Sequence, residues 1–203
     1  MRPKASAAIL AGGQSRRMGR DKALVEIGGR PMLALVIERI RPLFDDLFIA
    51  GGDEKIYGAF GIPVHPDVRP GSGSLGGIYT ALVKAAHPVV FCVACDMPFV
   101  NPDLVAFLLG EMEKDPFQAV VPTVGGEEEP LCAVYSRSAL PVIERDLDAG
   151  VRRIKSTLAS LEVRAVGADE MRPFDPELLT FFNINTPVDL GLALNRMGSA
   201  LES

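Results

Sequence analysis

The stretch Ala7-Ala-Ile-Leu-Ala-Gly-Gly-Gln-Ser-Arg-Arg-Met-Gly-Arg-Asp-Lys22 decides the fold that the sequence predicts. Its apolar start is typical of the end of a buried strand, and Gly12 and Gly13 let the backbone turn sharply with its N–H groups facing outward. The loop that follows carries four cationic side chains against one aspartate, in a chain whose net charge is −5. This arrangement favours a polyphosphate ligand, because one cation about 4 Å from one phosphate charge is worth roughly 4 kcal/mol at an effective dielectric near 20.

Two familiar phosphate-binding motifs do not explain this chain. A P-loop needs four residues between its glycines, then lysine and a hydroxyl residue, whereas five residues separate Gly13 from Gly19 and an arginine follows. A dinucleotide fingerprint occurs literally at Gly71-Ser-Gly-Ser-Leu-Gly76, but two prolines separate it from any expected strand. We interpret that match as a coincidence, so the first loop remains the predicted phosphate site.

Length and composition are those of an ordinary globular protein. The chain has 203 residues, of which 48% are hydrophobic and 23% charged, and we expect one domain over residues 1–203. No apolar run approaches the roughly 20 residues of a membrane span, and the run before the glycines is too short for a signal peptide. We therefore expect a cytoplasmic location and no membrane partner. The acidic charge and the scattered aromatic residues argue against nucleic acid as a ligand.

Strand-like and helix-like segments alternate along the chain, which is typical of parallel strands joined by crossover helices. The expected strands are 7–10, 46–50, 62–65, 89–94 and 161–166, and the expected helices start near Pro31, Leu75, Asn101, Ala139 and Thr186. Segments 119–121 and 131–135 flank a Gly-Gly turn and predict an antiparallel excursion close to the site. The segment from Thr180 is expected to be a strand that feeds the last helix. The predicted fold class is therefore α/β: three layers, with a mostly parallel twisted sheet, helices on both faces and a small antiparallel excursion.

The cysteines are interpreted as structural. Cys92 and Cys95 spell Cys-x-x-Cys, which is a redox or metal signature in some proteins, and Cys132 makes the number odd. The pair lies on an expected buried strand, however, where residues three apart face opposite sides of the sheet. With two histidines in the chain, we do not expect a histidine-based zinc site.

Asp96 is the candidate metal ligand. It stands just beyond the carboxyl end of an apolar strand, where open α/β sheets place their ligands, and Pro98 blocks an immediate helix. A carboxylate at this place can hold Mg²⁺, which shares its coordination with substrate phosphates and water. The alternative, an aspartate that bonds its own backbone in a turn, is less favoured beside a phosphate loop.

Three further charged positions leave more than one interpretation open. Asp67 begins a loop rich in glycine and serine, and it is either a sugar or base contact or a turn residue. The pair Arg152-Arg153 either binds a second phosphate or caps a helix end. The run Glu127-Glu128-Glu129 is interpreted as a solvated loop rather than a site.

Together these motifs resemble those of the molybdenum cofactor guanylyltransferases. The resemblance spans nearly the whole chain and implies the Rossmann-like α/β fold of the nucleotide-diphospho-sugar transferases. It rests on Leu10-Ala-Gly-Gly-x-Ser-x-Arg-Met-Gly-x-Asp-Lys22, Gly73-Ser-Leu-Gly-Gly-Ile78, Cys95-Asp-Met-Pro-Phe99 and Asn183-Ile-Asn-Thr-Pro187. It implies a Mg²⁺-dependent enzyme that transfers GMP from GTP to the phosphate of molybdopterin and that contacts proteins which deliver or accept the cofactor.

The resemblance also implies roles for individual residues. Those implied to bind the nucleotide are Leu10, Ala11, Gly12, Gly13, Lys22, Asp67 and Asp96. The implied catalytic residues are Arg17, Lys22 and Asp96, and Asp96 is the implied Mg²⁺ ligand. The residues implied to bind the pterin acceptor are Arg153, Asn183 and Asn185. The Leu-Ala-Gly-Gly form of the first motif favours guanine over the cytosine of the related cytidylyltransferases.

The chain departs from the family pattern at two places. The family often has asparagine at the end of the second strand, where this chain has Ala50 and then Gly51-Gly52, and Ser74 replaces a usual proline. Base specificity is therefore less secure than catalysis. The alternatives are a cytidylyltransferase or sugar-1-phosphate nucleotidyltransferase of the same fold, or a nucleotide-binding module without catalysis.

Overall fold

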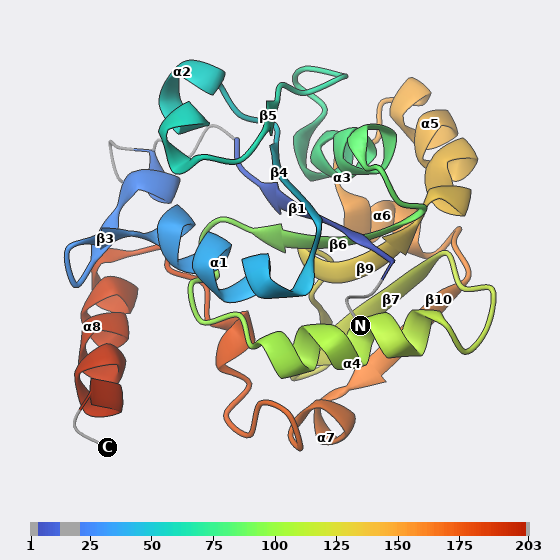
Figure 1. Cartoon of the computed structure of the whole chain (residues 1–203). Helices are drawn as coiled ribbons and strands as arrows, with labels where there is room; N and C mark the ends of the chain where they lie inside the picture. Colours follow the sequence, from blue (N-terminus) through green and yellow to red (C-terminus); the bar gives the residue numbers. More distant parts are fainter. Residues whose placement is uncertain (1–3, 13–20, 202–203) are drawn as a thin grey trace.

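The computed structural model describes residues 4–12 and 21–201 (Figure 1). The strands of its main sheet are β1 (Ser6–Leu10), β4 (Asp46–Ala50), β5 (Val64–His65), β6 (Val89–Ala94), β7 (Ala119–Val124), β8 (Glu127–Glu128), β9 (Cys132–Ser136) and β10 (Val163–Gly167). Their spatial order is β10-β7-β9-β6-β1-β4-β5, with β8 paired to β7. A separate antiparallel pair is formed by β2 (Glu26–Ile27) and β3 (Arg30–Pro31).

Helices cover both faces of the sheet, as the sequence predicts (Figure 1). The helices are α1 (Met32–Ile40), α2 (Glu54–Tyr57), α3 (Gly73–Lys84), α4 (Pro102–Met112), α5 (Leu140–Asp148), α6 (Ile154–Leu158), α7 (Ala168–Met171) and α8 (Pro187–Leu201). Apolar residues of α1, α4 and α7 pack on one face, and those of α3, α5 and α6 pack on the other. The mostly parallel, three-layer α/β class is thereby confirmed.

Strand β1 lies inside the sheet, between β4 and β6, and is buried on both faces. It pairs in parallel with β4 and with β6, so that Ile9 lies between Ile49 and Val93. Ile9 is buried against the α1 and α4 layer, and its neighbour Ala8 is buried against the α3 layer. Burial on both faces is the environment that parallel strands need, and it explains why the apolar run has no polar alternation.

The same alternation separates the two cysteines of the Cys-x-x-Cys pair. Cys92 is buried with the α3 layer, whereas Cys95 packs on the α1 layer, which confirms that they face opposite sides of the sheet. The thiols of Cys92, Cys95 and Cys132 are free. Burial, together with the charge of Asp96, raises the pKa of Cys95 to about 12.

The antiparallel segment expected after residue 119 is confirmed, and β9 lies inside the sheet. It runs antiparallel to both of its neighbours, β6 and β7, while the short strand β8 folds back on β7. The segment that leads into β9 reaches the candidate active site, because Leu131 lines the cavity beyond the carboxyl ends of β1, β4 and β6.

The strand expected from Thr180 is wrong. Residues Leu179–Phe181 form a single 3₁₀ turn, and an irregular segment leads from there to α8. The cause is Asp175, whose carboxylate accepts hydrogen bonds from the backbone N–H groups of Leu179 at 3.1 Å and Thr180 at 2.8 Å. A side chain that takes these donors competes with strand pairing.

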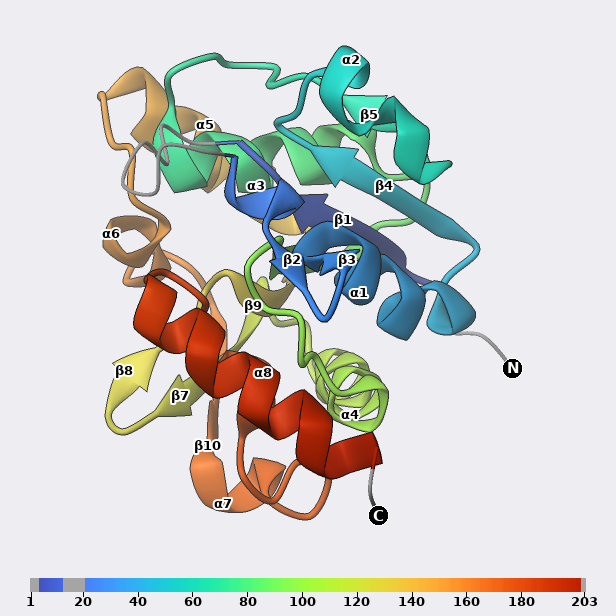
Figure 2. The same ribbon diagram turned by 90° about the vertical axis from the view of Figure 1, so that its left-hand side faces the viewer.

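The predicted cap of the last helix is confirmed. The Thr186 hydroxyl accepts from the backbone N–H of Asp189 at 3.2 Å, and the Asp189 carboxylate accepts from the N–H of Thr186 at 2.8 Å. This reciprocal pair is a capping box. Helix α8 packs on the β2 side of the molecule, where Ala193 is buried beside Ile27 (Figure 2). Over the described ranges, the structure has no helix with the length and apolarity to span a membrane.

Candidate active site

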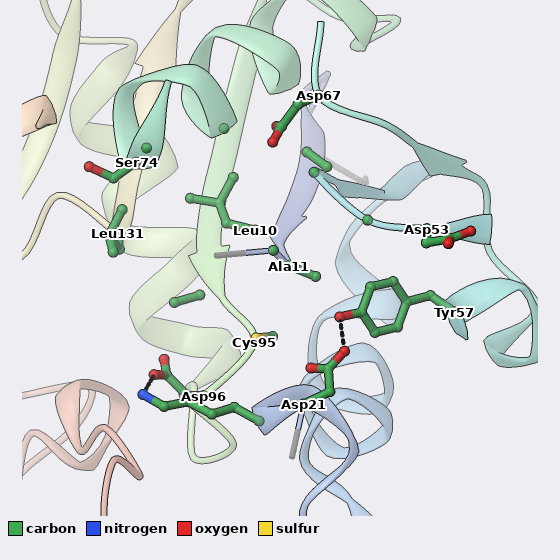
Figure 3. Close-up of a pocket in the computed structure, with 18 of the residues that line it drawn as sticks. Leu10, Ala11, Asp21, Asp53, Tyr57, Asp67, Ser74, Cys95, Asp96 and Leu131 are labelled. Carbon is green, nitrogen blue, oxygen red and sulfur yellow. Dashed lines mark hydrogen bonds and ion pairs between the residues drawn. The ribbon is translucent and has the colours of Figure 1, made fainter. Parts of the chain in front are cut away.

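The main cavity, with a volume of about 1160 Å³, lies beyond the carboxyl ends of β1, β4 and β6 (Figure 3). The connection after β1 packs on one face of the sheet and α3 packs on the other, so the cavity lies at the point where the chain changes face. This is the ligand position of open α/β sheets. Six of the residues predicted to bind a nucleotide line it: Leu10, Ala11, Gly12, Lys22, Asp67 and Asp96. The seventh predicted nucleotide-binding residue, Gly13, and the predicted catalytic residue Arg17 lie outside the described residues.

The turn after β1 is pressed against the turn after β4, and this contact requires glycine. Gly12 has a φ of 120°, and a Cβ added there would lie 1.9 Å from the carbonyl oxygen of Gly51. The Ala11 N–H donates to the carbonyl oxygen of Ala50 at 3.0 Å, which locks the two turns together. Gly51 thus lines the main cavity beside the turn after β1.

Three predicted residues from distant parts of the chain converge at one edge of this cavity. The Lys22 ammonium lies 3.5 Å from a carboxylate oxygen of Asp96 and 2.5 Å from the amide oxygen of Asn185. The side chains of Lys22 and Asp96 are only 14% and 17% exposed. Burial raises the pKa of Asp96, and the charge of Lys22 opposes that shift. A carboxylate and an ammonium in this setting are strongly dependent on each other, since each would otherwise be a poorly solvated single charge.

The donor set around Asp96 fits a metal that takes most of its ligands from the substrate. Among the described residues, no group of three or more histidine, cysteine, aspartate or glutamate side chains is placed to hold a metal ion. Mg²⁺ does not need such a cage, because it is usually bound through one or two carboxylates, substrate phosphates and water. The half-buried carboxylate of Asp96, which lines the main cavity, is therefore suited to Mg²⁺.

Asp67 lies at the opposite end of the cavity from Asp96 (Figure 3). Its Oδ1 atom is buried and has no hydrogen-bond partner in the part of the chain that the structure describes. A Cβ on Gly51 would come within 2.9 Å of that oxygen. Burial raises the pKa of Asp67, and Thr80 partly offsets the shift. Buried acceptors without partners are rare, so the position of Asp67 suits a ligand that donates hydrogen bonds.

A second cavity, of about 520 Å³, adjoins the first. Both are lined by Ser74, Asp96 and Leu131. The three residues predicted to bind the acceptor, Arg153, Asn183 and Asn185, all line the second cavity. Asp96 therefore stands at the boundary between two adjoining spaces, as a reaction between two substrates requires.

The structure separates the two arginines that the sequence left together. The Arg152 guanidinium donates to the carbonyl oxygens of Leu147 at 3.3 Å and Val151 at 3.1 Å, next to the end of α5. Arg153 begins α6 and lines the second cavity. Arg152 is thus a helix-end residue, and Arg153 is available to an anion.

Two features of the site escaped the sequence analysis. The Tyr57 hydroxyl donates to the Asp21 carboxylate at 2.5 Å, and both residues line the main cavity. In the run of glutamates interpreted as a solvated loop, Glu127 is exposed and bound to Lys155 at 2.9 Å, but Glu128 and Glu129 line the second cavity. Glu128 and Glu129 are half-buried, and the solvated-loop interpretation stays a prediction for them.

Comparison with known proteins agrees with this geometry. The family model described as a MobA-like NTP transferase domain matches residues 7–163. The chain is 37% identical to a probable molybdenum cofactor guanylyltransferase of Pelotomaculum thermopropionicum, over 92% of this chain and 90% of that protein. It is 39% identical to the molybdenum cofactor guanylyltransferase of Desulfosudis oleivorans, over 90% of each. Molybdopterin-guanine dinucleotide biosynthesis protein A of Archaeoglobus fulgidus is 34% identical and superposes with a TM-score of 0.87, over 96% of this chain and 99% of that chain.

Proposed function

The chain belongs to the family of MobA-like NTP transferase domains, and from this premise we propose that it transfers GMP from GTP to the phosphate of molybdopterin. The products are molybdopterin guanine dinucleotide and pyrophosphate. The observation that carries the proposal is the position of Lys22 and Asp96, at the boundary of a nucleotide-sized cavity and a second cavity lined by Arg153 and Asn185.

In this reaction an oxygen of the molybdopterin phosphate attacks the α-phosphorus of GTP. A new phosphorus–oxygen bond forms, and the bond to the bridging oxygen of the β-phosphate breaks, so that pyrophosphate leaves with the electron pair. The chain needs no covalent intermediate, because the task is to align two phosphates and to stabilise the charge of the leaving group.

Different residues of the main cavity bind different parts of GTP. The backbone of Leu10, Ala11 and Gly12 and the ammonium of Lys22 hold the triphosphate, and Asp67 at the far end accepts hydrogen bonds from the nucleoside. Arg17, which belongs to the same sequence motif, stabilises charge during the transfer. Asp96 would hold Mg²⁺, and the bound ion would neutralise phosphate charge.

The residues of the second cavity orient the acceptor. The Arg153 carbonyl oxygen accepts from the N–H of Ser156, but the Arg153 guanidinium has no hydrogen bond or ion pair with another described residue, and a guanidinium of this kind suits a phosphate. Asn183 and Asn185 offer amide groups to the polar edges of the pterin. Guanidinium and amide groups in one cavity match a ligand that is part phosphate and part heterocycle.

The test is pyrophosphate release in the presence of Mg²⁺ and molybdopterin, with GTP, CTP, ATP and UTP compared in parallel. We expect release with GTP and little with the other three. Faster release with CTP or UTP would move the protein to the cytidylyl or sugar-phosphate transferases. Nucleotide binding by calorimetry without release in any mixture would identify a binding module.

A further inference from the structure

Both oxygens of the Asp21 carboxylate are engaged within the protein. Oδ1 accepts from the backbone N–H of Ala23 at 3.1 Å and so caps the short turn that contains Lys22. Oδ2 accepts from the hydroxyl of Tyr57 at 2.5 Å, which Figure 3 shows as a dashed line. The carboxylate next to Lys22 in sequence is therefore directed away from the lysine, whose ammonium contacts Asp96 and Asn185.

Tyr57 is firmly seated for this contact. Its side chain is buried, at the end of α2, and its ring packs against the backbone of Gly52. A Cβ on Gly52 would lie 2.5 Å from a ring carbon, so the seat depends on a glycine at that position. Burial and the negative charge of Asp21 raise the pKa of Tyr57 far above its ordinary value. The phenol therefore remains protonated and donates its proton to the bond.

The bond also joins two separate walls of the main cavity. Tyr57 follows the turn after β4, whereas Asp21 follows the loop after β1. All three side chains, Asp21, Lys22 and Tyr57, line the cavity. An ionised carboxylate here has two possible effects on a bound triphosphate: it repels the phosphates, or it draws the neighbouring ammonium away from them.

We propose that Tyr57 is a positioning residue for nucleotide binding: its hydroxyl holds the Asp21 carboxylate away from Lys22 and so leaves the lysine available to the triphosphate. The proposal rests on the proposed function, since it assumes that this cavity receives GTP. It assigns Tyr57 no contact with the substrate and no role in the chemical step.

The variant that tests the proposal is Tyr57→Phe, which keeps the ring and removes the hydroxyl. We expect the KM for GTP, and the dissociation constant measured by calorimetry without acceptor, to rise about tenfold, the size expected for one hydrogen bond to a charged group. The KM for molybdopterin should stay within twofold. Tyr79→Phe is the matched control, because the Tyr79 hydroxyl also donates to a carboxylate, that of Glu144 at 2.7 Å, outside the main cavity.

The double variant Tyr57→Phe with Asp21→Asn tests the route through the aspartate. Asparagine caps a turn as well as aspartate does but carries no charge. If the phenol acts by restraining that charge, the second change should return GTP affinity to within about twofold of the wild type. Unchanged affinity in Tyr57→Phe, an equal loss in Tyr79→Phe, or no recovery in the double variant would each overturn the proposal. A wild-type protein that binds GTP but releases no pyrophosphate would overturn the proposed function instead, and the calorimetric comparison would still decide the role of Tyr57.

Discussion

Lys22 and Asn185, which are 163 positions apart in the sequence, are joined by a hydrogen bond of 2.5 Å between the ammonium and the amide oxygen. The bond links the two cavities, because Lys22 lines the first and Asn185 lines the second. The backbone supports it, since the N–H of Ile184 donates to the carbonyl oxygen of Asp96 at 3.1 Å. The segment before α8 is therefore in contact with the residues of both cavities.

This link predicts different effects for the two asparagines. Asn185→Ala should raise the KM for GTP several-fold as well as the KM for molybdopterin, because it removes a partner of Lys22. Asn183→Ala should raise only the KM for molybdopterin, since the Asn183 amide contacts the carbonyl oxygen of Phe181 and not the lysine. Steady-state kinetics with each substrate varied in turn will distinguish them. Identical patterns in the two variants would contradict the link.

Replacement of Asp96 by alanine should reduce turnover by about 10²–10³-fold, the range typical of losing one electrostatic group of a catalytic site. Pyrophosphate release measured across a Mg²⁺ titration checks this result, and circular dichroism shows whether the fold is intact. We expect added Mg²⁺ to restore little activity. Full activity in the variant would refute the role assigned to Asp96.

Replacement of Lys22 by methionine, which keeps the length of the side chain, should weaken GTP binding at least tenfold and lower the rate as well. The loss follows from removing an ammonium from a poorly solvated site, where its interaction with phosphate is weakly screened. Lys84→Met is the control, because Lys84 is exposed on α3 and lies outside both cavities. Calorimetric titration with GTP and Mg²⁺ measures the difference.

The two neighbouring arginines should give opposite results. Arg153→Ala is expected to raise the KM for molybdopterin by about tenfold or more with little effect on the unfolding temperature, because Arg153 lines the second cavity. Arg152→Ala should lower the unfolding temperature by a few degrees, since it removes donors to two backbone carbonyls, and should leave KM nearly unchanged. A fall in acceptor affinity in Arg152→Ala alone would reverse the assignment.

Asp67 should make stability depend on pH. Burial raises the pKa of Asp67 above its ordinary value near 3.8, so the folded chain holds this proton more tightly than the unfolded chain. The contribution of this proton to folding stability is fully present below the ordinary pKa of aspartate. It is lost as the pH rises through the raised pKa of Asp67 in the folded chain. Asp67→Asn cannot ionise, and we expect it to unfold at a higher temperature than the wild type at pH 7.

At pH 3.5 the two proteins should unfold at nearly the same temperature, which differential scanning calorimetry measures. A difference of the same size at both pH values would show that ionisation is not its cause. The same substitution should weaken GTP binding, since an amide nitrogen cannot accept hydrogen bonds from the nucleoside.

The strands, the helices and much of the candidate site follow from local sequence. The apolar run before Gly12 predicts a buried strand because both of its faces need apolar cover, and the glycine turn predicts a backbone site because larger residues do not fit there. Asp96 is found for a similar reason: a carboxylate directly after an apolar strand lies at the ligand-binding edge of the sheet. The Asn101 side-chain oxygen caps α4 by accepting hydrogen bonds from the backbone N–H groups two and three positions later. The start of this helix therefore also follows from local sequence.

Contacts between segments that are distant in sequence were decided only by the tertiary structure. The strand expected at Thr180 is replaced by a turn because Asp175 takes its backbone donors, and Arg152 differs from Arg153 because the end of α5 lies beside only one of them. Tyr57 meets Asp21 across two loops that only the pairing of β1 with β4 brings together. The local sequence pattern determines whether a segment forms a helix, a strand or a turn, because the interactions that select this structure lie within a few residues of each other. The partners of a charged or polar side chain depend on which helices and strands pack together. This packing forms only when the whole chain folds.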